Sequence, residues 1–191
     1  MPGASTQRVA AIASALALLL VTPVLLFCTE PIAVRFWFAV VVTAGIASFV
    51  TLLSRRLLFS SVIACSLVVV VFLVSLEKQT TMNMGLHSYD LFFYLNADTL
   101  EFLWGDYRRC VVGVLAALAA ATILVALTWR FDATRLSRLA SGAALIVAAM
   151  VAGAFEPRAS AESGAFRLFT QDNSFVSAFY LSWVENPDRQ T

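Results

Sequence analysis

Charged residues are scarce in this chain. Of its 191 residues only 13% are Asp, Glu, Lys or Arg, whereas 60% are hydrophobic, and the mean hydropathy is +0.84. Soluble domains carry about 25% charged and about 45–50% apolar residues. The composition therefore excludes a water-soluble fold and indicates an integral membrane protein.

Motifs that carry chemistry are missing as well. The chain has a single histidine, His87, and its three cysteines show no metal-ligand spacing, so the sequence predicts no metal site. It contains no P-loop, Gly-rich dinucleotide fingerprint, nucleophile elbow or zinc motif. The sequence thus assigns no catalytic residue, predicts no cofactor in this chain, and gives no support to nucleic-acid binding.

Long apolar runs dominate what is present. A membrane-spanning helix needs about 20 predominantly apolar residues, and five such runs occur, at residues 9–28, 35–53, 58–76, 110–129 and 138–155. The sequence predicts an all-α integral membrane protein with five transmembrane helices. None of the runs carries Lys, Asp, Glu or His in its middle, which disfavours a pump or channel because such proteins need buried ionisable groups.

The first run also invites comparison with a cleaved signal peptide. Its apolar core is longer than that of a signal peptide, and Thr29-Glu30-Pro31 is a poor cleavage site. We therefore expect it to stay as a span. The cysteines at its outer end and at the start of the fourth run, Cys28 and Cys110, would meet only in an oxidising compartment; free thiols are the commoner outcome, and the pairing stays open.

The distribution of arginine predicts the orientation. With a cytoplasmic N-terminus, the short inner segments hold one acid, Asp132, and the following basic residues: Arg8, Arg55, Arg56, Arg130, Arg135 and Arg138. The longer outer segments have mixed charge, which is the positive-inside pattern. We expect the C-terminus outside, an outer loop at 77–109, and an outer helix and tail at 156–191.

Two amphipathic segments are expected to form interfacial helices on the outer face. From Ser88 to Trp104, apolar residues recur at helical spacing opposite an acidic face. From Phe175 to Val184 an apolar stripe runs opposite Ser174, Ser177 and Ser182.

Small residues suggest how the spans pack. They lie four apart in the fourth run at Gly113 and Ala117, and in the fifth at Ala149 and Gly153, so that two backbones can approach closely. We expect these two spans to pack tightly in the bundle. The third run, 58–76, has few small residues and is expected to face lipid.

Basic residues at the outer ends of two spans are the candidate lipid-binding site. Lys78 follows the third run, and Arg108 and Arg109 precede the fourth, so all three are expected at headgroup depth. Arg holds a phosphate in a bidentate way and Lys as a point charge; ordinary snorkelling at a helix end is the alternative. His87 and Asp90, from the loop between, complete the predicted set.

The loop carries Lys78, then Leu86, then Tyr89-Asp90-Leu91, and the segment at 175–180 reads FVSAFY. Together with five spans and a long loop after the third, these residues resemble the membrane part of sulfatase-fold phosphoglycerol and phosphoethanolamine transferases of the lipoteichoic acid synthase type. That family has a lysine followed by a leucine and an Asp-Leu pair, and its lead-in to the catalytic domain is similar to FVSAFY. The resemblance covers the whole chain in topology but only about a dozen residues in motif.

The resemblance implies a module of the bacterial cytoplasmic (inner) membrane that anchors a catalytic domain and binds a lipid donor. Its expected partners are membrane phospholipid and a catalytic domain or subunit on the outer face. Such enzymes carry an extracellular domain with a metal-bound threonine nucleophile, and no residue here matches that role, so the chain alone should be inert. The second hypothesis is a non-catalytic scaffold or assembly subunit of a cell-envelope polysaccharide synthesis or export complex.

Overall fold

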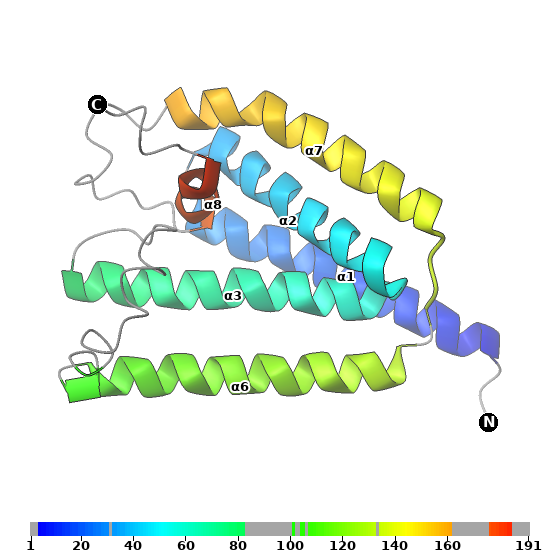
Figure 1. Ribbon diagram of the computed structural model, residues 1–191, viewed down its shortest axis with the longest axis horizontal. Helices are drawn as coiled ribbons and strands as arrows, with labels where there is room; N and C mark the ends of the chain where they lie inside the picture. The colour runs from blue at the N-terminus through cyan, green and yellow to red at the C-terminus, as the bar shows by residue number, and fades with distance from the viewer. Residues whose placement is uncertain are drawn as a thin grey trace.

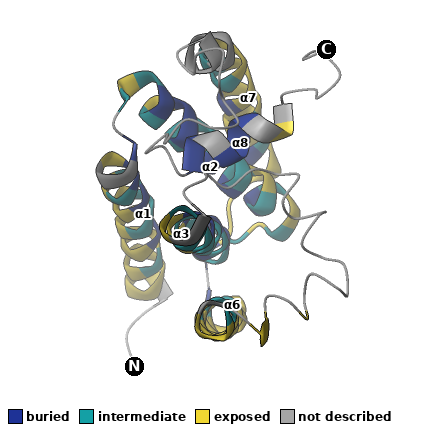
Figure 2. Cartoon of the chain, turned by 90° about the vertical axis from the view of Figure 1, so that its left-hand side faces the viewer, coloured by how far each residue is buried: buried dark blue, intermediate teal, exposed yellow. Residues whose placement is uncertain are grey.

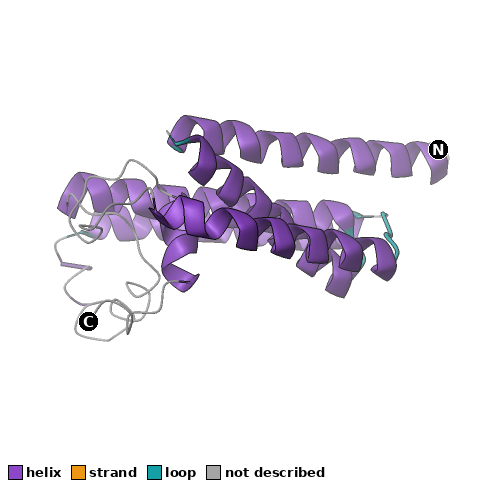
Figure 3. Ribbon diagram, turned by 90° about the horizontal axis from the view of Figure 1, so that it is seen from above, coloured by secondary structure: helices purple, strands orange, loops and turns teal. Residues whose placement is uncertain are grey.

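Five long helices and one short helix make up the described part of the chain. The computed structural model describes residues 4–30, 32–82, 101, 104–105, 107–132, 134–161 and 176–184. The helices are α1 (Ala4–Thr29), α2 (Ala33–Ser54), α3 (Leu57–Met82), α6 (Arg108–Phe131), α7 (Arg138–Ala161) and α8 (Val176–Val184) (Figure 1). Seen from above, these described segments are helix and loop only (Figure 3).

The five long helices are long and apolar enough to cross a membrane. Their qualifying segments are Ser5–Phe27, Ala33–Ser54, Leu57–Thr80, Val111–Phe131 and Arg138–Phe155. Each predicted run falls inside one of these helices, because uninterrupted apolar sequence with no charge at its centre can satisfy its backbone in lipid only as a helix. The prediction of an all-α membrane protein with five spanning-length helices is confirmed.

Consecutive long helices run in opposite directions, so the bundle has two distinct ends. One end holds the turn between α1 and α2, the C-terminal ends of α3 and α7, the start of α6, and α8 (Figure 1); we call it the α8 end. The other holds the α2–α3 turn at Arg55 and Arg56 and the α6–α7 connection at 132–137; we call it the arginine end.

Helix α3 is central to the bundle, which contradicts its expected lipid-facing position. It packs against α1, α2 and α6. Its buried face repeats at helical spacing through residues that are small or β-branched: Ser61, Ala64, Val68, Val71 and Ser75. Serine counts among the small residues that allow neighbouring helices to approach closely, so this helix has more of them than its apolar composition suggests.

The close packing expected of the fourth and fifth spans is not found at Gly113 or Gly153. Helix α6 packs on α3 and α7 packs on α2, and α6 and α7 lie at opposite edges of the bundle (Figure 1). A Cβ added at Gly113 or Gly153 would meet nothing within 4 Å, whereas one at Gly45 would lie 3.5 Å from the Cβ of Ala148. Small residues permit close packing without selecting the partner, and here they act between α2 and α7.

The outer helices present apolar side chains outward. Much of α6 and of α1 is exposed in the burial view (Figure 2), and the exposed side chains on α6 include Leu115, Leu118, Ile123 and Leu127. Such surfaces would be unfavourable in water but match a hydrocarbon solvent. This burial pattern fits the membrane assignment made from composition.

Candidate functional site at the α8 end

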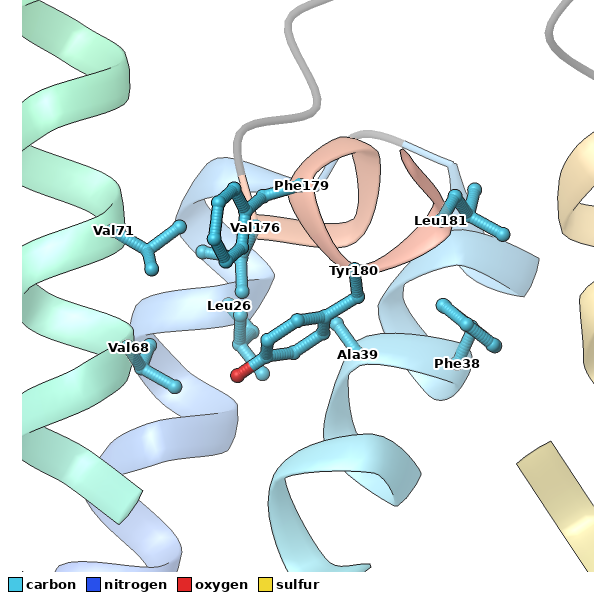
Figure 4. Close-up of a cluster of buried hydrophobic side chains, with 9 residues drawn as sticks. All are labelled: Leu26, Phe38, Ala39, Val68, Val71, Val176, Phe179, Tyr180 and Leu181. Atoms are coloured by element: carbon cyan, nitrogen blue, oxygen red, sulfur yellow. The ribbon is translucent and has the colours of Figure 1, made fainter. Parts of the chain in front are cut away.

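Helix α8 packs into the α8 end of the bundle. Its buried side chains are Val176, Phe179, Tyr180 and Leu181. They contact an apolar surface that we call the α8 groove, formed by Leu26 of α1, Phe38 and Ala39 of α2, and Val68 and Val71 of α3 (Figure 4). Trp183, one turn after Phe179 and edge-on to its ring with centroids 6.2 Å apart, is 55% exposed. The expected helix is present, and protein covers the part of its apolar stripe formed by Val176, Phe179 and Tyr180.

The N-terminus of α8 is held by a carboxylate from the other end of the chain. Glu30, which follows α1, is only 4% exposed. Its Oε1 accepts hydrogen bonds from the backbone N–H groups of Val176, at 2.8 Å, and Ser177, at 2.9 Å, and its Oε2 accepts one from the Ser177 hydroxyl at 2.6 Å. Glu30 therefore caps a helix that begins 146 residues later.

Ser177 was expected on a polar face opposite the apolar stripe, and that expectation is wrong. Ser177 is fully buried, and its burial is tolerated because its hydroxyl and its N–H both donate hydrogen bonds to Glu30. Glu30 was not predicted to have this role. The only signal was an acid between two apolar runs, since a cap so distant in sequence leaves no local pattern.

The chemistry of this contact is that of a charged cap. The first N–H groups of a helix lack intrahelical partners and carry partial positive charge, and hydrogen bonds to an ionised acceptor are shorter and stronger than neutral ones. A helix of nine residues is marginal in water by itself. The helical state of α8 therefore depends on Glu30 and on the α8 groove.

Tyr180 adds a second polar contact. Its hydroxyl lies 3.3 Å from Thr43 Oγ1 of α2, and Thr43 also donates to the carbonyl of Ala39 at 2.7 Å. Burial raises the pKa of Tyr180 above its usual value of 10.0; the Thr43 hydrogen bond lowers it, and the negative charge of Glu30 raises it further. The phenol is therefore neutral in the docked helix.

The described basic residues of the predicted lipid site lie at this same end. Lys78 is half-buried near the end of α3, and Arg108 and Arg109 are exposed in the first turn of α6. At the arginine end, Phe59 of α3 and Trp129 of α6 stack with ring centroids 4.9 Å apart. Counting from that pair at about 1.5 Å per residue, Lys78 and Arg109 lie roughly 29 and 30 Å along the two antiparallel helices.

The structure thus places Lys78 and Arg109 at nearly the same height on two helices that pack together. The Arg108 guanidinium lies 5.6 Å from the ring centroid of Trp104, within the range of a cation–π contact. His87 and Asp90 fall outside the described residues, and so does most of the first expected interfacial helix, Ser88 to Trp104. Their part in the site stays a prediction.

A second carboxylate fastens the arginine end. Asp132 follows α6 and is buried. Its Oδ2 accepts a hydrogen bond from the Phe59 N–H at 2.9 Å, and its Oδ1 accepts from the Thr134 N–H at 2.7 Å and from the Thr134 hydroxyl. Thr134 Oγ1 in turn accepts from the Leu57 N–H at 3.2 Å. The α6–α7 connection therefore caps the N-terminus of α3.

Aromatic contacts support the same junction. The Arg56 guanidinium lies 4.2 Å from the ring centroid of Trp129, which in turn packs edge-on against Phe59. The Leu136 N–H donates to the Arg55 carbonyl at 3.1 Å. The arginine end is thus held by contacts between α3, α6 and the two connections.

The described residues offer no candidate metal site. Among them, no group of three or more His, Cys, Asp or Glu side chains comes together. Cys65 of α3 is a free thiol that lies 2.8 Å from Thr22 Oγ1 and donates to the Leu18 carbonyl at 3.1 Å, which joins α3 to α1. The side chains of Cys28 and Cys110 are outside the described set.

Comparison with protein-family models, with curated protein sequences and with solved structures finds no match for this chain. The resemblance to sulfatase-fold transferases therefore rests only on topology, on the loop residues and on the segment at 175–180.

Proposed function

We propose that this chain is a non-catalytic membrane module that binds a phospholipid headgroup at its α8 end and positions a catalytic domain or partner subunit there. In this proposal it resides in a bacterial cytoplasmic membrane and serves a phosphoglycerol or phosphoethanolamine transferase. The observation that carries the proposal is the common height of Lys78 and Arg109 on the packed helices α3 and α6.

Charge distribution supports an outer position for the α8 end. The arginine end concentrates its charge in short connections, with Arg55, Arg56, Arg135 and Arg138 against Asp132. Short segments rich in Arg stay in the cytoplasm. The α8 end then faces outward, together with the C-terminus.

Helix electrostatics support an anionic ligand at the start of α6. Arg108 and Arg109 occupy the first turn, where the helix dipole already provides positive charge. Two cations are unfavourable there unless an anion compensates them. A lipid phosphate would do so, because it can accept hydrogen bonds from guanidinium groups and from helix N–H groups.

The exposed side of α8 supports an interfacial position. Trp183 is more than half exposed, and tryptophan is enriched at the headgroup level of membranes. In the proposal, α8 and the segment from Ser88 to Trp104 form the outer interfacial layer.

Lipid retention tests the binding proposal. The chain is purified in mild detergent from membranes containing phosphatidylglycerol and phosphatidylethanolamine, and bound phospholipid is counted by native mass spectrometry. We expect Lys78→Gln with Arg108→Gln and Arg109→Gln to weaken retention by about tenfold or more, because hydrogen bonds to charged groups contribute about 1.5–3 kcal/mol each.

The matched control neutralises two exposed arginines at the arginine end, Arg135→Gln with Arg138→Gln. It removes a similar amount of positive charge from the opposite end and should retain the same lipid as the wild type. Equal loss in the two variants would mean that the lipid is held by general charge attraction, which contradicts a site at the α8 end.

Activity and partner assays separate the transferase module from a scaffold. With a labelled lipid donor, the purified chain should transfer no headgroup, and full transferase activity would overturn the proposal. Capture from mild detergent should recover a sulfatase-type partner. Recovery of a polysaccharide synthase or export proteins would favour the scaffold, for which the exposed face of α8 at Trp183 is a ready docking surface.

A further inference from the structure

We propose that the arginine end holds a second lipid: the guanidinium of Arg56, stacked on Trp129, binds the headgroup phosphate of an anionic phospholipid in the leaflet at that end. This site lies at the opposite end of the bundle from Lys78 and Arg109. The inference therefore goes beyond the proposed function and does not depend on it.

Arg56 is held where two helices meet. It lies half-buried in the α2–α3 turn, and its guanidinium carbon is 4.2 Å from the ring centroid of Trp129, near the C-terminus of α6. Trp129 packs edge-on against Phe59 of α3, which fixes the position of the indole ring. The Arg56 N–H donates to the Ser54 hydroxyl at 3.2 Å. The cation is therefore kept at a defined place by its backbone and by a cation–π contact.

The guanidinium of Arg56 is not compensated by an acid in the part of the chain that the structure describes. Its Nη1 atom is buried there without a hydrogen-bond partner. Asp132, the acid at this junction, already accepts hydrogen bonds from Phe59 and Thr134. A buried donor without an acceptor is costly, and a guanidinium group binds phosphate with two parallel hydrogen bonds. An anion that draws the Arg56 side chain outward would supply the acceptor.

Further positive charge surrounds this position. Arg55 is exposed beside Arg56, at the C-cap of α2, and Arg130 is exposed in the last turn of α6, next to Trp129. Basic residues close to a membrane surface attract anionic lipids. A zwitterionic lipid brings its own cation and is attracted less. The local charge therefore favours a headgroup with a net negative charge.

Exposed apolar side chains beside these cations favour a lipid over a soluble anion. Leu53, near the end of α2, is 67% exposed, and Trp129 and Phe131 of α6 are 49% and 72% exposed. An inorganic phosphate or an acidic peptide would leave this apolar surface uncovered, whereas acyl chains would cover it. Tryptophan is also enriched at the headgroup level of membranes. The ligand that matches both features has an anionic head and an apolar tail.

The test measures which lipid lies next to Trp129. Trp37→Phe, Trp104→Phe and Trp183→Phe leave Trp129 as the one tryptophan of the full chain. The chain is placed in phosphatidylcholine nanodiscs that contain a small fraction of phosphatidylglycerol or phosphatidylcholine brominated on the acyl chains, because bromine quenches nearby tryptophan. We expect phosphatidylglycerol to be enriched next to Trp129 about fivefold or more over phosphatidylcholine, which is the factor for one basic residue near a membrane surface.

Two variants make the result specific to Arg56. Arg56→Gln should reduce quenching by brominated phosphatidylglycerol to the level of phosphatidylcholine. Quenching by brominated phosphatidylcholine should stay the same in this variant, which reports that Trp129 keeps its place. As the matched control, Arg135→Gln with Arg138→Gln removes two exposed arginines from the same end and should keep the enrichment.

Equal quenching by the two brominated lipids in the chain that retains all its arginines would overturn the proposal, and this measurement needs no arginine variant. An equal fall of phosphatidylglycerol quenching in Arg56→Gln and in the matched control would overturn it as well, because general charge attraction would then explain the enrichment. Loss of the enrichment on addition of inorganic phosphate would show that the site takes a soluble anion, which contradicts a lipid ligand.

Discussion

Asp132 offers the sharpest test of how the arginine end is held. Its buried carboxylate receives three hydrogen bonds, from the N–H of Phe59 and from the N–H and hydroxyl of Thr134. We consider the substitution Asp132→Asn, which keeps the shape of the side chain. It removes the charge and leaves one acceptor oxygen where there were two.

The expected cost follows from counting donors. One amide oxygen can accept two hydrogen bonds, so at least one buried donor loses its partner, which costs about 1–3 kcal/mol. Loss of negative charge at the α3 N-terminus adds about 0.3–1 kcal/mol. We expect Asp132→Asn to lower the free energy of unfolding by about 1.3–4 kcal/mol, which corresponds to roughly 3–16 °C in melting temperature for a chain of this size.

The assay is thermal unfolding of the purified chain in detergent, followed by tryptophan emission, because Trp129 lies at this junction. Arg135→Gln is the matched control: it changes one charge on the same connection at an exposed position, and it should melt within about 2 °C of wild type. If Asp132→Asn and Arg135→Gln melt together, the carboxylate does not fasten α3, and the reasoning is refuted.

Two further predictions concern α8 and the α2–α7 contact. Tyr180→Phe removes the hydroxyl near Thr43 and should weaken α8 docking by about 0.5–1.5 kcal/mol. Because the pKa of Tyr180 is raised in the docked state, wild-type docking should be constant from neutral pH to about 10 and weaken above it. Tyr180→Phe should show no such loss, and tryptophan emission from α8 measures docking in both proteins. Gly45→Leu should destabilise the bundle by about 1–3 kcal/mol, since a Cβ added at Gly45 would already lie 3.5 Å from the Cβ of Ala148. Gly153→Leu, which has open space, should not destabilise it, and equal melting temperatures of the two variants would contradict the assigned packing.

The membrane-spanning helices could be predicted because their signal is local. Each run of about 20 apolar residues specifies a helix by itself, through the need to satisfy its backbone in lipid. All five were recognised, and the structure extends α3 to Met82, past the end of the run at residue 76. The extra turns contain polar residues, so they lie beyond the end of the apolar run.

Packing between the helices was harder to predict because it is not local. The spacing of small residues singled out Gly113 and Gly153, yet an added Cβ would meet nothing within 4 Å at either, whereas at Gly45 it would lie 3.5 Å from the Cβ of Ala148 in another helix. The spacing of small residues indicates that another helix can approach closely, but it does not indicate which helix. The choice depends on the connections, and the short α2–α3 turn at Arg55, with its positive φ of 60°, is one that sequence could place.

The attachment of α8 could not be predicted either, because it also depends on residues far apart in sequence. The apolar stripe from Phe175 to Val184 predicted a helix there, and the helix exists. A local pattern can indicate only a cap close in sequence, whereas the structure supplies a cap from Glu30. A capping residue so distant in sequence can be recognised only when the fold has brought the two segments together.

Chemical mapping of the two ends in whole cells tests the central claim, a five-span bundle whose α8 end faces outward. In a chain with its native cysteines replaced, Trp183→Cys and Arg135→Cys place thiols at exposed positions on opposite ends. With a membrane-impermeant reagent, we expect Trp183→Cys to label in intact cells and Arg135→Cys to label only after permeabilisation. Labelling of both positions from the same side would contradict the account.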